Sequence, residues 1–158
     1  MVAATRRPEL VKSLTLIEPP AFSVARGYPE VERLIDNLQQ VYANEHTPES
    51  FLAGFFRALN HVVTEPLRLS PLHIKAVTAT MTEAEPWKIP LALDELCQRP
   101  FPKLIVSGNW HPALRICAKI LVQQLGAQHY VVEDVGHDIQ KVGQPFNARL
   151  KQFISSAQ

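Results

Sequence analysis

The stretch FPKLIVSGNWHPALRICAKILVQQLGAQHYVVED, residues 101–134, decides the fold class of this chain. It begins with a short apolar run, 102–108, of the kind found in strands buried on both faces. An amphipathic segment follows at 111–126, and its last residue is a glycine, which commonly ends a helix. A second strand-like run covers 128–134. Strand, helix and strand in this order predict a parallel crossover unit and therefore an α/β fold.

One further strand and a final helix flank this unit. Residues 13–18, SLTLIE, form an apolar run that Pro19 and Pro20 end, because proline cannot donate to a sheet ladder. Residues 144–154 have helical spacing. We expect this last helix to turn four apolar side chains inward: Phe146, Leu150, Phe153 and Ile154.

Between the first strand and the second, the sequence predicts helices. Segment 28–45 has apolar residues at helical spacing with charges on the opposite side. Segments 47–62 and 70–85 begin with Thr-Pro and Ser-Pro, the usual pairing of an N-cap residue with proline at the first helical position. We therefore expect a helical insertion from about residue 21 to about residue 98.

Composition excludes several classes of protein. The chain has 158 residues, 46% of them hydrophobic, which is enough to bury a single packed core. Its 16 Lys and Arg residues nearly balance 15 Asp and Glu, and they are scattered, so no nucleic-acid partner is expected. No apolar stretch approaches the length of a membrane span and no signal peptide is evident, so we expect a cytoplasmic protein with no membrane partner. Cys97 and Cys117 are expected to be buried free thiols rather than a disulfide or zinc ligands.

The segment VVEDVGHDIQ, residues 131–140, places Gly136 and His137 between the last strand and the closing helix. With this motif the chain resembles the C-terminal half of the α/β-hydrolase superfamily. Residues 3–20 resemble the sixth strand and the helix before it, 101–126 the seventh strand and its helix, and 129–154 the eighth strand, the histidine loop and the last helix. The resemblance implies a partial hydrolase core at 1–20 and 99–158, with a helical cap or lid at 21–98.

The resemblance also implies a catalytic base and an acid. His137 matches the base of the triad, although a histidine in a loop can also simply bond a neighbouring carbonyl. The acid could follow the seventh strand, where His111 stands, or end the sixth strand, where Glu18 stands. A histidine cannot be the negative partner that fixes a second imidazole, so Glu18 is preferred. Asp134 and Asp138 are expected to face solvent or cap a helix.

The nucleophile of this superfamily sits in a G-x-S-x-G turn, which does not occur in these 158 residues. Ser107 follows the wrong strand and lacks that turn. In chain order the nucleophile precedes the acid and the histidine, so we expect it before residue 1. The implied function is hydrolysis of an ester, an amide or a related acyl bond by the intact protein, without metal or cofactor, and this chain alone is expected to be inactive.

Binding residues and partners complete the expectations. Trp110, His111 and Phe55 are candidates for the walls of a substrate pocket, although Trp110 could instead cover the core and the phenylalanine could pack within it. The alternative function is a non-catalytic module that binds a small molecule or a protein. The strand at 13–18 would have lost its neighbour on one side. Its open edge predicts a homodimer, poor solubility or a complementing N-terminal chain.

Overall fold

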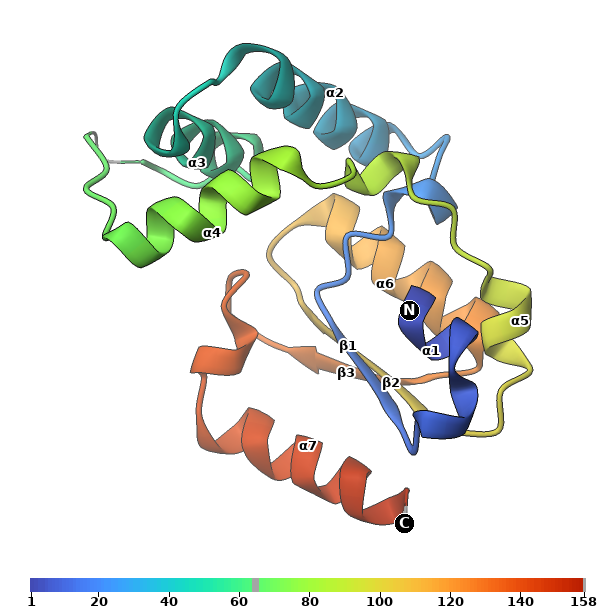
Figure 1. Ribbon diagram of the computed structural model, residues 1–158. Coiled ribbons are helices and arrows are strands. Elements are labelled where there is room, and N and C mark those ends of the chain that lie inside the picture. The colour runs from blue at the N-terminus through green and yellow to red at the C-terminus, as the bar shows by residue number, and fades with distance from the viewer. Residues whose placement is uncertain (64–65, 158) are drawn as a thin grey trace.

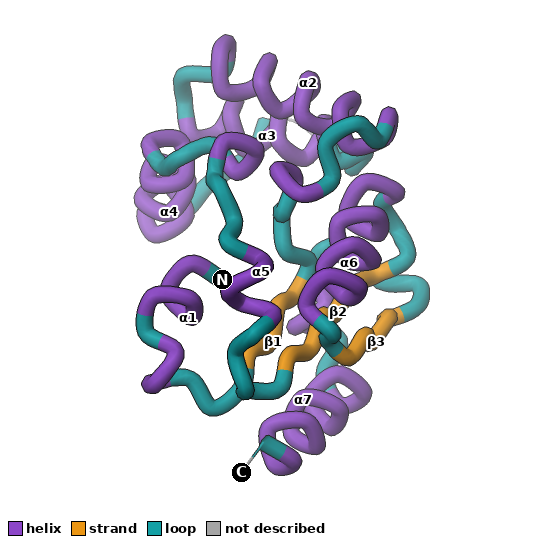
Figure 2. The backbone as a smooth tube through the Cα atoms, turned by 90° about the vertical axis from the view of Figure 1, so that its right-hand side faces the viewer, coloured by secondary structure: helices purple, strands orange, loops and turns teal. Residues whose placement is uncertain are grey.

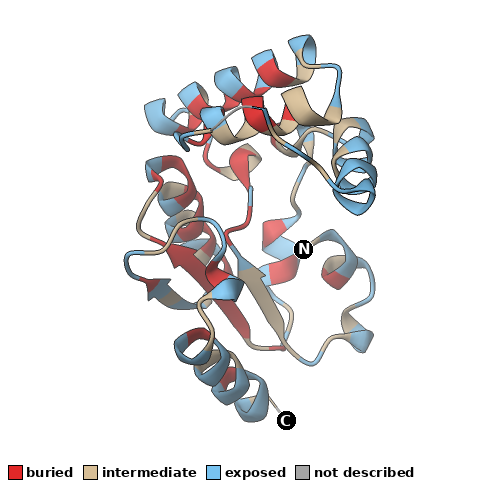
Figure 3. Cartoon of the chain, turned by 90° about the vertical axis from the view of Figure 1, so that its left-hand side faces the viewer, coloured by how far each residue is buried: buried red, intermediate tan, exposed pale blue. Residues whose placement is uncertain are grey.

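A three-stranded parallel sheet forms the centre of the molecule (Figure 1). The computed structural model describes residues 1–63 and 66–157. Its strands lie in the order β1 (Leu14–Ile17), β2 (Lys103–Gly108) and β3 (Gln128–Val132). β2 is buried along its whole length, whereas β1 and β3 are partly exposed (Figure 3). The predicted α/β class and the parallel crossover are confirmed.

Helices cover both faces of the sheet (Figures 1 and 2). The crossover helix α6 (Pro112–Leu125) lies on one face together with α1 (Val2–Arg6) and α5 (Leu93–Cys97), and α7 (Gln144–Ser156) lies on the other. Successive side chains of β2 alternate between the faces. Ile105 therefore packs in the cluster under α6, whereas Leu104 and Val106 pack with residues of α7.

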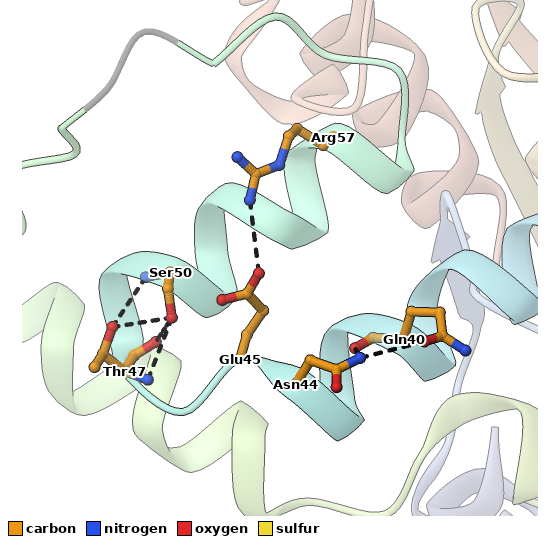
Figure 4. Close-up of polar contacts among 6 residues, drawn as sticks. All are labelled: Gln40, Asn44, Glu45, Thr47, Ser50 and Arg57. Carbon is orange, nitrogen blue, oxygen red and sulfur yellow. Dashed lines mark hydrogen bonds and ion pairs between the residues drawn. The ribbon is translucent and has the colours of Figure 1, made fainter.

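The three predicted cap helices form, and the second and third begin at their predicted N-caps, Thr47 and Ser70. They are α2 (Pro29–Asn44), α3 (Pro48–Ala58) and α4 (Pro71–Thr82). The Thr47 hydroxyl accepts the Ser50 N–H at 3.2 Å, and the Ser50 hydroxyl accepts the Thr47 N–H in return (Figure 4). The Ser70 hydroxyl accepts the His73 N–H at 3.3 Å. The described residues also form four short 3-10 helices: Pro8–Leu10, Phe22–Val24, Pro86–Lys88 and Ile139–Lys141.

The cap shares its apolar cluster with α6. Trp87 and the inner side chains of α2 and α3 pack against the first two turns of α6, at Ala113, Leu114 and Cys117. Burial at this junction raises the pKa of the Cys117 thiol to about 12. α4 lies over α3 and has no buried side chain among its described residues. The division at residues 20 and 98 remains a prediction, and Leu96 packs with the sheet cluster rather than with the cap cluster.

Two predicted burials are wrong. Cys97 is exposed because it ends the short helix α5, whose buried residues are Leu93 and Leu96. Ile154 is 45% exposed because it follows Phe153 by one residue, which rotates it about 100° away from the buried face of α7. Both cysteines are free, as expected. No helix within residues 1–63 and 66–157 is long and apolar enough to cross a membrane.

β1 lies at the edge of the sheet. The backbone N–H groups of Leu14 and Glu18 donate to carbonyls of Pro102 and Val106 at 3.0 and 2.9 Å. Since peptide groups alternate in direction along a strand, those of Thr15 and Ile17 point away from β2, and no strand of the described chain pairs with them. A groove of about 1010 Å³ runs beside this edge and is lined by residues of α1 and of the segment that leads into β1.

Candidate functional site

Glu18 directly follows β1, at the carboxyl end of the sheet. Its side chain is buried, and its φ of 45° lies in the left-handed region. This conformation is rare for a residue other than glycine, and a following proline normally favours an extended backbone instead. The backbone N–H of Glu18 nevertheless continues the pairing with β2. In this conformation Glu18 both continues the backbone pairing with β2 and keeps its side chain buried.

The carboxylate of Glu18 has a hydrogen-bond donor on each oxygen. The backbone N–H of Gly108, at the end of β2, donates to Oε1 at 2.6 Å. The indole Nε1–H of Trp110 donates to Oε2 at 3.0 Å. A buried carboxylate requires such donors, because without them removal from water strongly disfavours its charged form. The two bonds therefore fix the carboxylate at the carboxyl end of the parallel strands, where such sheets usually bind ligands.

His137 lies in the loop after β3 and faces the same carboxylate. Its Nδ1 is 3.7 Å from Oε2 of Glu18, and its side chain is 47% exposed. This distance is longer than a hydrogen bond, but bonds between catalytic groups are often long before a substrate binds. The structure thus brings together the two residues that the sequence predicts as acid and base.

A cavity of about 450 Å³ opens beside His137. The cavity is lined by the end of α3, by the segment that follows α3, and by the loop after β3. The lining residues are Phe56, His61, Val62, Gly136, His137, Asp138 and Lys141. Phe55 instead packs against the cap cluster, so its predicted role in the pocket remains a prediction. The ring of Trp110 lies 5.0 Å from that of His61 and 6.1 Å from that of His137, measured between centroids.

His61 is a site residue that the sequence does not reveal. The predicted helix extends to residue 62, but α3 ends at Ala58. Asn60 then adopts a φ of 60°, and the N–H of His61 donates back to the Phe56 carbonyl at 2.9 Å. This left-handed turn directs the imidazole toward Trp110. Asparagine is tolerant of this conformation, and it is the one local signal that could have indicated the turn.

His111 precedes α6 and is buried. Within the described part of the chain its Nδ1 has no hydrogen-bond partner. Burial lowers the pKa of His111, Glu18 partly offsets this effect, and His61 adds to it. His111 lines a small cavity of about 120 Å³ under α2, separate from the one beside His137. Its predicted role in substrate binding remains a prediction.

The buried state of His111 predicts a pH-dependent stability. Above its ordinary pKa of 6.5, both the folded and the unfolded chain hold the imidazole neutral. Below this pH the unfolded chain binds a proton more readily, so the free energy of unfolding falls as the pH is lowered. Burial and Lys119 lower the pKa of His129 and add to this effect. Urea denaturation between about pH 8 and about pH 5 should show it.

The variant His111→Gln should lose part of this pH dependence, because glutamine does not titrate. His46→Gln is the matched control, since His46 is exposed. Comparison of the two variants cancels the contribution of carboxylates to the slope. Equal slopes of unfolding free energy against pH in both variants would contradict a buried neutral imidazole at position 111.

The remaining candidates have other partners. Ser107 is buried, and its hydroxyl on β2 lies 2.9 Å from Nε2 of His129 on the neighbouring strand β3. Asp134 and Asp138 are exposed, as expected, and Asp138 pairs with Lys141 at 2.6 Å. Among residues 1–63 and 66–157, no three His, Cys, Asp or Glu side chains are grouped to hold a metal ion.

Comparison with known proteins adds no family to this description. No family model, no curated protein and no solved structure matches the chain. The arrangement of Glu18, Trp110 and His137 is therefore the basis on which a function can be argued.

Proposed function

We propose that this chain is the C-terminal part of a serine-type α/β hydrolase, in which Glu18 is the acid and His137 the base of the triad. One observation carries the proposal: Oε2 of Glu18 lies 3.7 Å from Nδ1 of His137, and both residues follow parallel strands at the carboxyl end of the sheet. The order of the two residues in the chain, acid before histidine, also agrees with the order in this fold.

In this proposal each residue has a step in acyl transfer. His137 turns Nδ1 toward the carboxylate, which leaves Nε2 to take a proton from an attacking serine and return it to the leaving group. Glu18 holds the imidazole in this orientation and stabilises its charged form. The serine itself, in a G-x-S-x-G turn, would come from a segment preceding residue 1. The bond attacked would be an ester, an amide or a related acyl bond of a small molecule.

The cavity beside His137 supports the small-molecule substrate. Its volume of about 450 Å³ falls within the range of ligand sites, and the cap supplies apolar walls through Phe56 and Val62. The same cavity supports the alternative function, a module that binds a small molecule without reaction. No cofactor is part of either proposal.

The proposal predicts that residues 1–158 alone lack hydrolase activity. Because no serine, threonine or cysteine among the described residues lines the cavity beside His137, hydrolysis of short-chain nitrophenyl esters should be no faster for the unmodified chain than for His137→Ala. His46→Ala serves as the control for nonspecific catalysis by surface imidazoles. A burst of nitrophenol that requires His137 and not His46 would contradict the proposal, since it would reveal a nucleophile within the chain.

The open edge of β1 supports a second proposal, that the chain associates through residues 13–18. Pairing with a further strand would satisfy the outward peptide groups of Thr15 and Ile17. We expect a homodimer at micromolar concentration by size-exclusion chromatography with light scattering. Ile17→Lys, at a side chain that is 36% exposed, should shift the chain to monomer by placing like charges on the paired edges.

Val131→Lys is the matched control for this assembly, because Val131 is 37% exposed on β3, the opposite edge of the sheet. It should leave the dimer intact. Aggregation of the unmodified chain that Ile17→Lys relieves would also support the edge as the site of association. A monomer whose amides at 13–18 are strongly protected from hydrogen exchange would contradict the proposal.

A further inference from the structure

Trp110 contacts both members of the Glu18–His137 pair. Its indole Nε1–H donates to Oε2 of Glu18, and its ring lies beside the ring of His137. From the sequence Trp110 is predicted to line a pocket or to cover the core. Its ring packs against the apolar cluster between the cap and α6, and its one polar atom in addition donates to the acid.

The contact determines how the carboxylate is turned. The bond from Gly108 fixes Oε1, but a single hydrogen bond leaves the other oxygen free to swing. An indole N–H is a donor only, so it binds Oε2 when that oxygen faces Trp110. In this orientation Oε2 also faces Nδ1 of His137 at 3.7 Å. The direction of the indole and the direction of the carboxylate are thus linked.

The cap holds the indole from its other side. The ring of His61 lies 5.0 Å from that of Trp110 at an interplanar angle of 40°, and the ring of Phe56 lies 6.0 Å from that of His61. The ring of His111, at the start of α6, lies 5.3 Å from the ring of Trp110. These neighbours restrict the rotation of the indole, so its N–H remains directed at Glu18.

We propose that Trp110 is the positioning residue for the Glu18 carboxylate, and that its indole N–H turns Oε2 so that His137 carries its proton on Nδ1 and presents a free Nε2. The catalytic meaning of this inference rests on the proposed function, because a free Nε2 matters to a base that takes a proton from serine. The tautomer itself is a property of the chain and can be measured without any turnover.

The experiment measures the tautomer of neutral His137 in the ¹⁵N-labelled chain at alkaline pH, from the two-bond correlations of the imidazole ring. Signals absent from His137→Ala identify the residue. Trp110→Phe keeps an aromatic ring and removes the donor. It should lower the ratio of the Nδ1–H to the Nε2–H form by about fivefold, the factor that corresponds to the net contribution of a typical hydrogen bond.

Trp87→Phe is the matched control. Trp87 is buried in the cap, and its Nε1 has no hydrogen-bond partner among the described residues, so loss of that N–H should leave the His137 ratio unchanged. Should Trp110→Phe fail to fold, Glu18→Gln provides a second measurement. In this variant the indole N–H resonance of Trp110 should move, and that of Trp87 should stay in place.

The outcomes separate this inference from the proposed function. An unchanged ratio in Trp110→Phe, together with a lower ratio in Glu18→Gln, would overturn the role of Trp110 and leave the acid–base pair standing. An unmodified chain in which His137 is mainly the Nε2–H form, unaffected by Glu18→Gln, would overturn the pair itself. An indole N–H resonance of Trp110 that does not move in Glu18→Gln would also overturn the inference.

Discussion

Glu18→Gln should reduce turnover by about four orders of magnitude in a chain supplied with the proposed nucleophile segment, because loss of the orienting carboxylate has an effect of this size in a serine triad. Glutamine has nearly the same shape, but it cannot stabilise the charged form of His137. The measurement is kcat on a nitrophenyl ester. His111→Ala, the other predicted acid position, should cost far less, since His111 lines a separate cavity.

The same substitution should also lower the free energy of unfolding of residues 1–158 alone. Both oxygens of Glu18 accept bonds, from Gly108 and from Trp110. A glutamine amide has only one oxygen, so one of these donors would face its NH₂ group. The free energy of unfolding should fall by about 1–3 kcal/mol, as for a buried donor left unpaired.

Small and equal effects of Glu18→Gln and His111→Ala on turnover would identify Glu18 as an ordinary buried residue and not as the acid.

Gly108→Ala should lower the free energy of unfolding by about 1–3 kcal/mol or more, the usual effect of overpacking a buried site. A Cβ at this position would lie 2.6 Å from Cδ1 of Trp110 and 2.7 Å from the carbonyl oxygen of Val135. The indole would have to move, and the Val135 backbone with it. Since Gly108 also donates to Glu18, the variant should lose the Trp110 bond to the carboxylate as well.

Gly136→Ala is the matched control for this prediction, because it adds the same methyl group one residue before His137. Its Cβ would meet only Cε1 of His61 at 3.6 Å, an ordinary contact. Chemical denaturation should therefore separate the two variants clearly. Equal stability of Gly108→Ala and the unmodified chain would mean that Trp110 can leave its place at no cost, contrary to a tightly held indole.

The sequence predicts the elements of this fold better than the contacts of the site. Periodicity and the Thr-Pro and Ser-Pro starts locate the cap helices, and the double proline locates the end of β1 next to Glu18. These are local signals. The bonds from Gly108 and Trp110 to Glu18 join residues 90 and 92 positions apart, and no pattern in a single sequence specifies such a pair.

Ile154 and His61 show the limits of periodicity itself. Ile154 fits an apolar pattern, but the buried face of α7 is narrow and ends at Phe153. His61 fits the continuation of a helix that Asn60 ends with one left-handed residue. In the first case, a shift of one residue along α7 places the side chain on another face of the helix. In the second, one left-handed residue ends the helix and directs the next side chain elsewhere.

The cluster that joins the cap to α6 also makes a large displacement of the cap costly. Swinging α2 and α3 away as a rigid lid would expose Leu114 and Cys117 together with the cap residues packed on them, at a cost of about 25 cal/mol for each square ångström of apolar surface. Displacing the backbone at 60–63 alone leaves that cluster intact, and Val62 there is already 95% exposed. If a ligand binds in the cavity beside His137, a local displacement of residues 60–63 would therefore widen its path at a smaller cost than a hinge motion of α2 and α3. Substitutions at 60–63 should change the rate of ligand exchange, and substitutions on the outer face of α2 should not.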